Sequence, residues 1–175
     1  PNAGKSTFIS KISHARPKIA DYPFTTLIPN LGVVQLEDFS TFVAADIPGL
    51  VEGAHRGKGL GIRFLKHTER SRLLVHLLDF SSGNIRDPLD DYRIVQNELE
   101  CFSKSLYERP QILVASKVDH MEAKEKFQEL ELRLKEVNAD VHAISSMTGE
   151  GLPKLLWRIK AMIDKLKAEE SGMAS

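Results

Sequence analysis

Hydrophobic positions along the chain change their spacing in a way that predicts alternating helices and strands. Leu89, Tyr92, Val95 and Leu99 recur every three or four residues, as on one face of a helix, whereas residues 112–115 form a short continuous apolar run typical of a buried strand. The same reasoning predicts helices over residues 4–13, 62–70, 89–106, 127–137 and 152–166, and strands over 33–36, 41–45, 73–78, 112–115 and 141–144.

Two long segments interrupt this pattern and are expected to be loops. Residues 16–30 contain three prolines, and residues 48–61 contain five glycines. Strands that alternate with helices indicate an α/β fold with a largely parallel sheet, and such sheets bind ligands at the carboxyl ends of their strands. We expect one domain over residues 1–168, followed by a frayed, disordered tail over 169–175 that begins near Ala168.

The composition narrows the class of protein. The chain is 42% hydrophobic and 27% charged, with 24 basic and 24 acidic residues. Its net charge of zero gives no indication of a nucleic acid or an anionic membrane as binding partner. A single cysteine, Cys101, fits a reducing compartment, and no apolar run approaches the ~20 residues that span a bilayer. These features lead us to expect a cytoplasmic protein without a membrane partner.

The first residues carry a phosphate-binding pattern. Pro1-Asn2-Ala3-Gly4-Lys5-Ser6-Thr7 matches the end of G-x-x-x-x-G-K-[ST], whose first glycine would lie two residues before Pro1. Backbone N–H groups at the start of the following helix would face the phosphates, Lys5 would reach the β- and γ-phosphates, and Ser6 would hold Mg²⁺. A Gly-Lys-Ser turn that merely opens a helix is the alternative. We expect the chain to lack the strand before this loop.

Two further segments suit the γ-phosphate and the metal. Asp46-Ile47-Pro48-Gly49 ends an apolar strand, where a carboxylate supports the Mg²⁺ ligands and a glycine N–H meets the γ-phosphate. The loop 16–30 contains two adjacent threonines, Thr25 and Thr26, and one of them would ligate Mg²⁺ when the γ-phosphate is bound. Its place in the pattern favours Thr26. A strand-ending Asp before a Pro-Gly turn, and a solvent-facing threonine, are the alternatives.

Two segments suit a guanine base. Ser116-Lys117-Val118-Asp119 follows a predicted strand and is similar to N-K-x-D, in which the aspartate accepts two hydrogen bonds from guanine and the lysine stem lies along the base. Ser145-Ser146-Met147 follows the next strand and is similar to S-A-K, whose backbone N–H meets guanine O6. For Asp119, a helix N-cap is the alternative.

In this order the motifs resemble those of the Obg family of GTPases, and the loop sequences strengthen the resemblance. The loop sequences that resemble those of the family are residues 18–27 and 29–32 in the first switch, and residues 46–50, 52–54, 57–61 and 64–67 further along the chain. The resemblance implies a Ras-like P-loop G domain, with its first strand missing here, that binds GTP or GDP with Mg²⁺ and hydrolyses GTP slowly. It assigns nucleotide contacts in the first switch to Phe24, Thr25, Thr26, Leu27 and Ile28, and catalytic roles to Lys5, Thr26 and Gly49. It also implies a monomer that associates with the large ribosomal subunit and its RNA.

Two departures leave alternatives open. Ser116 replaces the asparagine that reads guanine, which suggests weaker guanine binding or an ATP-using relative. Leu50 replaces the water-orienting glutamine of Ras-type enzymes, a substitution the Obg family shares. A nucleotide-binding scaffold with negligible hydrolysis is therefore a second alternative, and a K⁺ ion held by Asn2 is a candidate activator.

Overall fold

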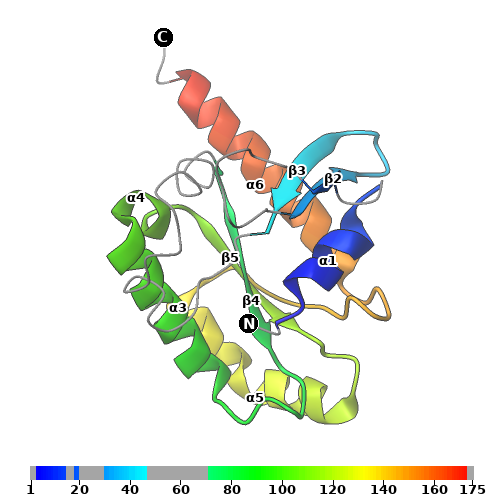
Figure 1. Ribbon diagram of the computed structural model, residues 1–175, viewed down its shortest axis with the longest axis vertical. Coiled ribbons are helices and arrows are strands. Elements are labelled where there is room, and N and C mark those ends of the chain that lie inside the picture. Colours follow the sequence, from blue (N-terminus) through cyan, green and yellow to red (C-terminus); the bar gives the residue numbers. More distant parts are fainter. Residues whose placement is uncertain (1–2, 15–17, 20–29, 47–70, 173–175) are drawn as a thin grey trace.

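The computed structural model describes residues 3–14, 18–19, 30–46 and 71–172 (Figure 1). Its helices are α1 (Lys5–Ile12), α3 (Pro88–Phe102), α4 (Lys104–Tyr107), α5 (Met121–Val137) and α6 (Leu152–Gly172). Its strands are β1 (Lys18–Ile19), β2 (Asn30–Gln35), β3 (Thr41–Ala45), β4 (Leu74–Asp79), β5 (Gln111–Ser116) and β6 (Val141–Ala143). Helices and strands alternate along the second half of the chain, which confirms the expected α/β class.

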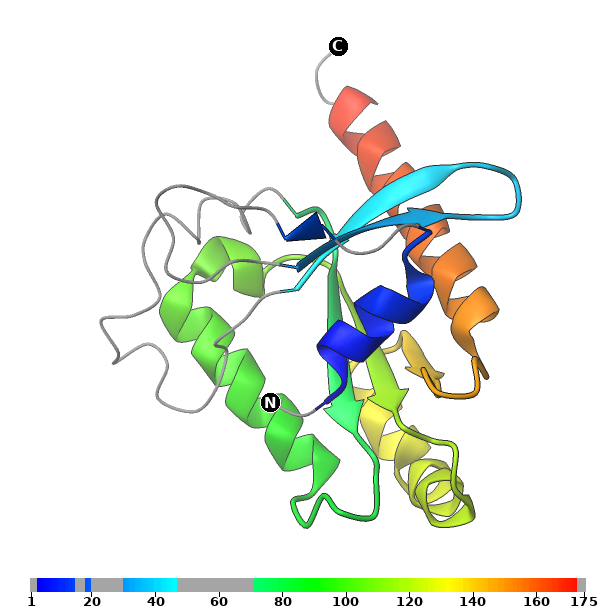
Figure 2. The same cartoon turned by 45° about the vertical axis from the view of Figure 1, so that its right-hand side comes forward.

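The described strands form two sheets of different kinds. β4, β5 and β6 are parallel, and their register places Asp79 opposite Ser116 at the carboxyl ends of β4 and β5. β1, β2 and β3 are antiparallel, with Val33 opposite Val43 in the β2–β3 hairpin, which projects from the side of the molecule in Figure 2. The expected hairpin is confirmed, and the expected parallel arrangement holds for the second sheet only.

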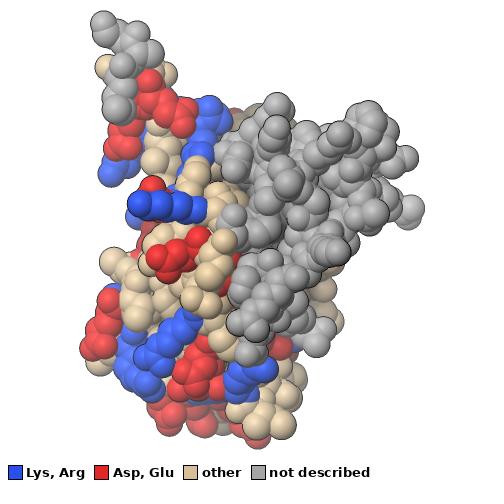
Figure 3. Space-filling view, turned by 60° about the vertical axis from the view of Figure 1, so that its left-hand side comes forward, with Lys and Arg blue, Asp and Glu red and all other residues tan. Residues whose placement is uncertain are grey.

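Charged side chains of both signs are interspersed on the face of the molecule shown in Figure 3. Some are paired along a helix, such as Lys135 with Glu131 at 2.7 Å. This mixture agrees with the zero net charge of the sequence. Among residues 3–14, 18–19, 30–46 and 71–172, no helix combines the length and apolar character needed to cross a bilayer.

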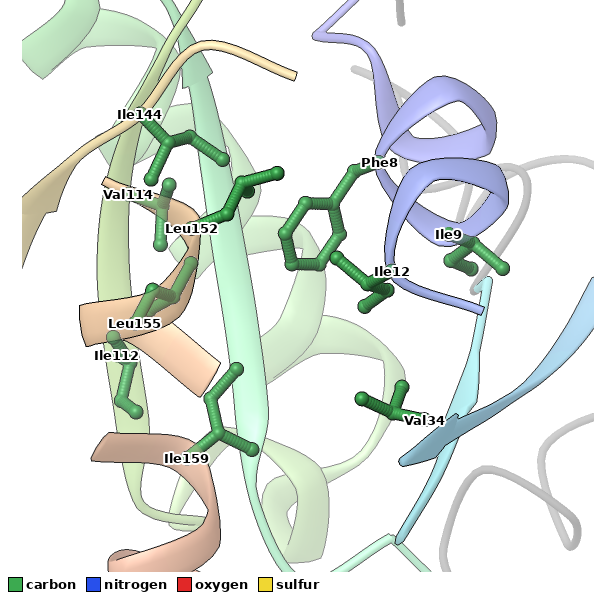
Figure 4. Packing of buried hydrophobic residues seen from close by; sticks show 10 residues of the cluster. All are labelled: Phe8, Ile9, Ile12, Val34, Ile112, Val114, Ile144, Leu152, Leu155 and Ile159. Atoms are coloured by element: carbon green, nitrogen blue, oxygen red, sulfur yellow. The ribbon is translucent and has the colours of Figure 1, made fainter. Parts of the chain in front are cut away.

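The parallel sheet is covered by helices on both faces. On one face, Phe8 and Ile12 of α1 point toward Leu152 of α6 and toward β5 (Figure 4), and Val34 joins this cluster from β2. On the other face, α3 and α5 pack over β4 and β5 around the fully buried Phe80. Removing a buried aromatic ring of this kind typically costs about 3–5 kcal/mol. The cluster around Phe8 and Ile12, on the first face, holds α1 and the phosphate-binding segment before it against the sheet.

Several element boundaries differ from the sequence prediction, among them the start of α5, which lies at Met121 and not at Phe127. The single helix expected over 89–106 is wrong: it breaks at Ser103, which is extended and whose Oγ accepts a hydrogen bond from the N–H of Leu106. The expected loop 16–30 contains the short strand β1 and, in Asn30, the start of β2. The helix α6 continues to Gly172, where a frayed tail was expected from Ala168. β4 extends to Asp79, one residue beyond the predicted strand. The helix expected over 62–70 lies outside the described residues.

Candidate nucleotide-binding site

The phosphate-binding segment ends in a left-handed glycine. Gly4 has φ = 87° and is the N-cap of α1, a conformation that favours glycine because it has no Cβ. Gly4 has no side chain with which to cap the helix, and the first turn of α1 contains no acidic residue. The first N–H groups of a helix lack partners within the helix and carry partial positive charge. The amino terminus of α1 is thus suited to an anion, as the motif predicts, with Lys5 as its first residue and Thr7 in its first turn.

Asp46 and Ser6 come together although they are 40 residues apart. The Ser6 hydroxyl lies 3.4 Å from Oδ2 of Asp46, which directly follows β3. Asp46 is buried, and its Oδ1 has no hydrogen-bond partner among the described residues. A buried carboxylate oxygen without a partner costs free energy unless a cation or a donor approaches it. Carboxylate and hydroxyl oxygens are the ligands that Mg²⁺ prefers, so these two residues fit that ion.

Ser116 connects the end of β5 to the phosphate-binding segment. Its Oγ lies 2.8 Å from the carbonyl oxygen of Ala3 and 2.8 Å from that of Leu78 in β4. The side chain is almost completely buried, and the hydroxyl has one hydrogen to donate to either carbonyl. The serine that replaces asparagine in the guanine motif therefore keeps a direct contact with the phosphate-binding segment.

Lys117 extends from the end of β5 past the phosphate-binding segment to Asp79. Its Nζ lies 2.8 Å from Oδ2 of Asp79, at the end of the neighbouring strand β4. A Cβ placed on Gly4 would lie 3.9 Å from Cε of Lys117, an ordinary van der Waals distance. The lysine stem therefore passes beside Gly4.

Asp119 and Ser145, from the two predicted guanine segments, are in contact. The Ser145 hydroxyl donates to Oδ1 of Asp119 over 3.1 Å. Oδ2 of Asp119 lies 3.2 Å from Nε2 of His120, and His120, not Asp119, is the N-cap of α5. Asp119 therefore does not cap this helix, and its carboxylate lies beside the second guanine segment.

The second guanine segment is held by its own backbone. The N–H of Ser145 donates to Glu150 over 3.0 Å, and the N–H of Gly149 donates back to Ser145 over 2.8 Å. Gly151 has φ = 77°, and a Cβ there would lie 2.2 Å from the Ala143 carbonyl oxygen, so this position requires glycine. Ser146 is half-buried, and Met147 is exposed. Met147 is therefore free to cover a flat ligand.

Several predicted site residues lie outside the described residues. They are Pro1, Asn2, Phe24, Thr25, Thr26, Leu27, Ile28, Ile47, Pro48 and Gly49. The described ones are Ala3 to Thr7, Asp46, Ser116, Lys117, Asp119 and Ser145 to Met147. They lie at the start of α1, directly after β3, at the end of β5 or just beyond it, and shortly after β6. Sequence reasoning missed Asp79. An acidic residue at the end of a strand next to a motif-bearing strand is the signal that would have indicated it.

Solved structures share this fold at low sequence identity. The G domain of the FeoB iron transporter of T. maritima matches with a TM-score of 0.67 and 22% identity, covering 93% of each chain. Era, in a complex with MgGDPNP and nucleotides of 16S ribosomal RNA, matches with a TM-score of 0.64 and 20% identity over 91% of this chain and 52% of Era. At this identity the likeness concerns the fold, which is that of a P-loop G domain.

Relatives with much higher identity carry the name GTPase Obg. The protein from Desulfitobacterium hafniense (strain DSM 10664 / DCB-2) is 51% identical over 170 residues, which are 97% of this chain and 40% of the relative. The protein from Solibacter usitatus (strain Ellin6076) is 52% identical over 168 residues, which are 96% of this chain and 49% of the relative. The chain thus spans less than half the length of these relatives.

The sequence resemblance to Obg proteins is confirmed by these identities. The family model described as "50S ribosome-binding GTPase" matches residues 1–117, more than half of the chain and a segment that includes the phosphate-binding residues, Asp46 and Lys117. This chain therefore belongs to the family of 50S ribosome-binding GTPases.

Proposed function

We propose that this protein binds GTP and GDP with Mg²⁺, hydrolyses GTP slowly and uses the change between the two nucleotides as a switch. The observation that supports this most is the convergence of separate motifs at one end of the fold. The left-handed Gly4 opens α1, the buried Asp46 faces Ser6, and Asp119 contacts Ser145. The phosphates would bind at the start of α1, the metal at Ser6 and Asp46, and the guanine base at Asp119.

Lys5 and Ser6 hold the phosphate end of the nucleotide in this proposal. Lys5 supplies a positive charge to the β- and γ-phosphate oxygens, on which negative charge develops during transfer. Ser6 and Asp46 hold Mg²⁺, directly or through water, and Thr26 adds a ligand in the GTP state. The ion, when bound, neutralises charge on the phosphates. The N–H of Gly49 contacts the γ-phosphate. When the γ-phosphate leaves after hydrolysis, this contact is lost and the loop 48–61 is released.

Asp119 and Lys117 hold the base end. Asp119 accepts hydrogen bonds from the guanine N1–H and exocyclic amine, and the stem of Lys117 lies along the base. A site built to pair these polar groups rejects a base that lacks them by several powers of ten. GTP is therefore the proposed substrate in preference to ATP.

We further propose that the protein acts as a cytoplasmic monomer on the large ribosomal subunit and its RNA. The support is the name of the family model and the identity to Obg proteins. In the sequence, seven basic residues lie within or close to the two long loops 16–30 and 48–61, which are Lys18, Arg56, Lys58, Arg63, Lys66, Arg70 and Arg72. Of these, Arg72 forms an ion pair with Glu170 of α6 at 2.9 Å. Leu50 cannot orient a water molecule, so we propose that K⁺ or the ribosomal partner accelerates hydrolysis.

Titration with fluorescent GTP, GDP and ATP, combined with single-turnover hydrolysis, tests the proposal. Lys5→Ala and Ser6→Ala should each weaken Mg²⁺-nucleotide binding at least tenfold, because each removes a charged or metal-binding contact. Lys11→Ala, in the last turn of α1, is a matched control and should bind normally. Normal affinity in both site variants would contradict the phosphate-site assignment. Binding without hydrolysis, with ribosomal subunits present, would favour the scaffold, and tighter binding of ATP would favour the ATP-using relative.

A further inference from the structure

Asp79 and Lys117 form an ion pair at the carboxyl ends of two neighbouring parallel strands. Asp79 is the last residue of β4, its register partner is Ser116, and Lys117 follows directly. The side chain of Asp79 is 15% exposed and that of Lys117 is 37% exposed, with 2.8 Å between Oδ2 and Nζ. The pair is therefore partly shielded from water, unlike the exposed ion pairs that contribute little to stability.

The carboxylate of Asp79 is fixed independently of Lys117. Its Oδ1 accepts hydrogen bonds from the N–H and the hydroxyl of Ser81, at 2.9 and 2.7 Å. Its carbonyl oxygen accepts from Asn84 Nδ2 at 2.9 Å, and the next residue, Phe80, is fully buried and donates its N–H to Ser116. Asp79 is thus a rigid anchor on β4 at which a cation can be held.

Two opposing effects act on the pKa of the Asp79 carboxyl. Burial by itself raises the pKa of the Asp79 carboxyl, but the hydrogen bonds from Lys117 and Ser81 outweigh burial and leave the pKa below its ordinary value. Asp79 therefore carries its negative charge at neutral pH.

Lys117 adopts a backbone conformation that is costly for a lysine. Its φ is 63°, in the left-handed region that non-glycine residues rarely occupy. In this backbone conformation the aliphatic stem of Lys117 passes beside Gly4, and its Nζ reaches Asp79. A lysine without a partner for its Nζ would be free to leave this path, because its side chain has four rotatable bonds.

We propose that Asp79 is a positioning residue for nucleotide binding: it holds Lys117 against the phosphate-binding segment, so that the lysine stem is in place before the base arrives. This inference rests on the proposed nucleotide function. Asp79 acts through Lys117, which the proposed function assigns to the base and not to the γ-phosphate. Its loss should therefore weaken GDP and a GTP analogue by the same factor, unlike the loss of a γ-phosphate contact.

Stopped-flow dissociation of fluorescent GDP and GTP analogues tests this inference. Asp79→Ala and Asp79→Asn should raise both dissociation rates about tenfold, the effect expected when a charge-assisted hydrogen bond that orders the site is lost. In the Lys117→Ala background, Asp79→Ala should add nothing, because the residue through which it acts is already gone. Lys117→Met keeps most of the stem without the charge and should resemble Asp79→Ala.

Asp140→Ala is the matched control. Asp140 has the same 15% exposure and pairs with Arg158 at 2.8 Å, but it lies before β6, at the opposite end of the parallel sheet. It should leave nucleotide dissociation unchanged. The near-UV circular dichroism of each variant shows whether it is folded, and Asp79→Asn, which keeps the shape of the side chain, serves if Asp79→Ala is not.

Two results would overturn the inference while the nucleotide function stands. One is a wild-type protein that binds GDP while folded Asp79 variants release it within twofold of the wild-type rate. The other is an effect of Asp79→Ala that is undiminished in the Lys117→Ala background, which would make Asp79 a structural residue only. A wild-type protein that binds no guanine nucleotide would overturn the proposed function, and this inference with it.

Discussion

The hydroxyl of Ser116 lies 2.8 Å from the carbonyl oxygen of Ala3, so a residue of the guanine motif touches the phosphate-binding segment directly. The same hydroxyl is 2.8 Å from the Leu78 carbonyl oxygen in β4. Serine donates one hydrogen, whereas an asparagine amide donates two and is able to satisfy both carbonyls. The substitution at position 116 therefore preserves the link between the two ends of the site but reduces its hydrogen-bonding capacity.

Ser116→Ala should weaken GDP binding about fivefold, because it removes a buried hydrogen bond that contributes about 1 kcal/mol. Ser116→Asn should bind GDP as well as the wild type or more tightly, since it restores the asparagine of N-K-x-D. Titration with fluorescent GDP measures both. An unchanged affinity in Ser116→Ala, with the fold intact, would show that the contact between Ser116 and Ala3 does not support the nucleotide site.

Asp119→Asn should shift the base preference from guanine toward xanthine. The substitution replaces one acceptor oxygen of the carboxylate with a donor amide, which matches the additional carbonyl oxygen of xanthine. It also keeps an oxygen that accepts from Ser145, at present 3.1 Å away, so the second guanine segment should stay in place. Competition between GDP and XDP measures the shift, and an unchanged preference for guanine would remove Asp119 from base recognition.

Local motifs made part of the site predictable, because adjacent residues carry the required chemistry. Gly4, Lys5 and Ser6 need only the start of a helix to act together. The placement of the two guanine segments after neighbouring strands also came from the sequence, and the contact between Asp119 and Ser145 agrees with it, because the strand ends of a parallel sheet lie at one edge. The motif and the order of the strands are both visible in the spacing of residues along the sequence.

Other features depended on partners distant in the chain. The ion pair of Asp79 with Lys117 joins residues 38 apart and has no motif of its own. The two-residue strand β1 exists because Lys18 and Ile19 pair with β2, and periodicity gives no signal over two residues. The break at Ser103 reflects a local hydrogen bond that competes with the helix, which apolar spacing does not record.

GTP turnover should be faster in KCl than in NaCl at equal ionic strength, and Asn2→Ala should abolish the difference. A K⁺ held by the Asn2 side-chain oxygen and by phosphate oxygens would place positive charge where other GTPases receive an arginine. Asn2 lies outside the described residues, so its sequence position carries this prediction. Equal rates in the two salts, or a difference that survives Asn2→Ala, would leave the ribosomal partner as the activator.

Phe39→Asn should stabilise the protein by about 0.5–1 kcal/mol. Phe39 lies at the tip of the β2–β3 hairpin with φ = 62° and 80% exposure, so it bears the cost of a left-handed conformation and buries little surface. Asparagine tolerates this conformation well. Ile85→Asn is the control, because Ile85 is fully exposed without a positive φ. Urea unfolding measures both, and equal changes in the two variants would mean that the backbone at Phe39 is not strained.

The stability of the protein should fall between pH 6.5 and pH 4 because of His76. This histidine of β4 stacks on Tyr92 of α3 with 5.3 Å between ring centroids, and burial lowers its pKa from 6.5 to about 4. Below pH 6.5 the imidazole takes up a proton in the unfolded chain but not in the folded chain. This stabilises the unfolded state relative to the folded state until the pH reaches the folded pKa. The loss should amount to about 3 kcal/mol over this range. His76→Phe, which keeps the stacked ring without a titrating group, should show a smaller decrease, and the exposed His14→Gln should behave as the wild type. Urea unfolding at several pH values measures the difference, and parallel curves for wild type and His76→Phe would contradict a half-buried His76 that stays neutral in the folded protein.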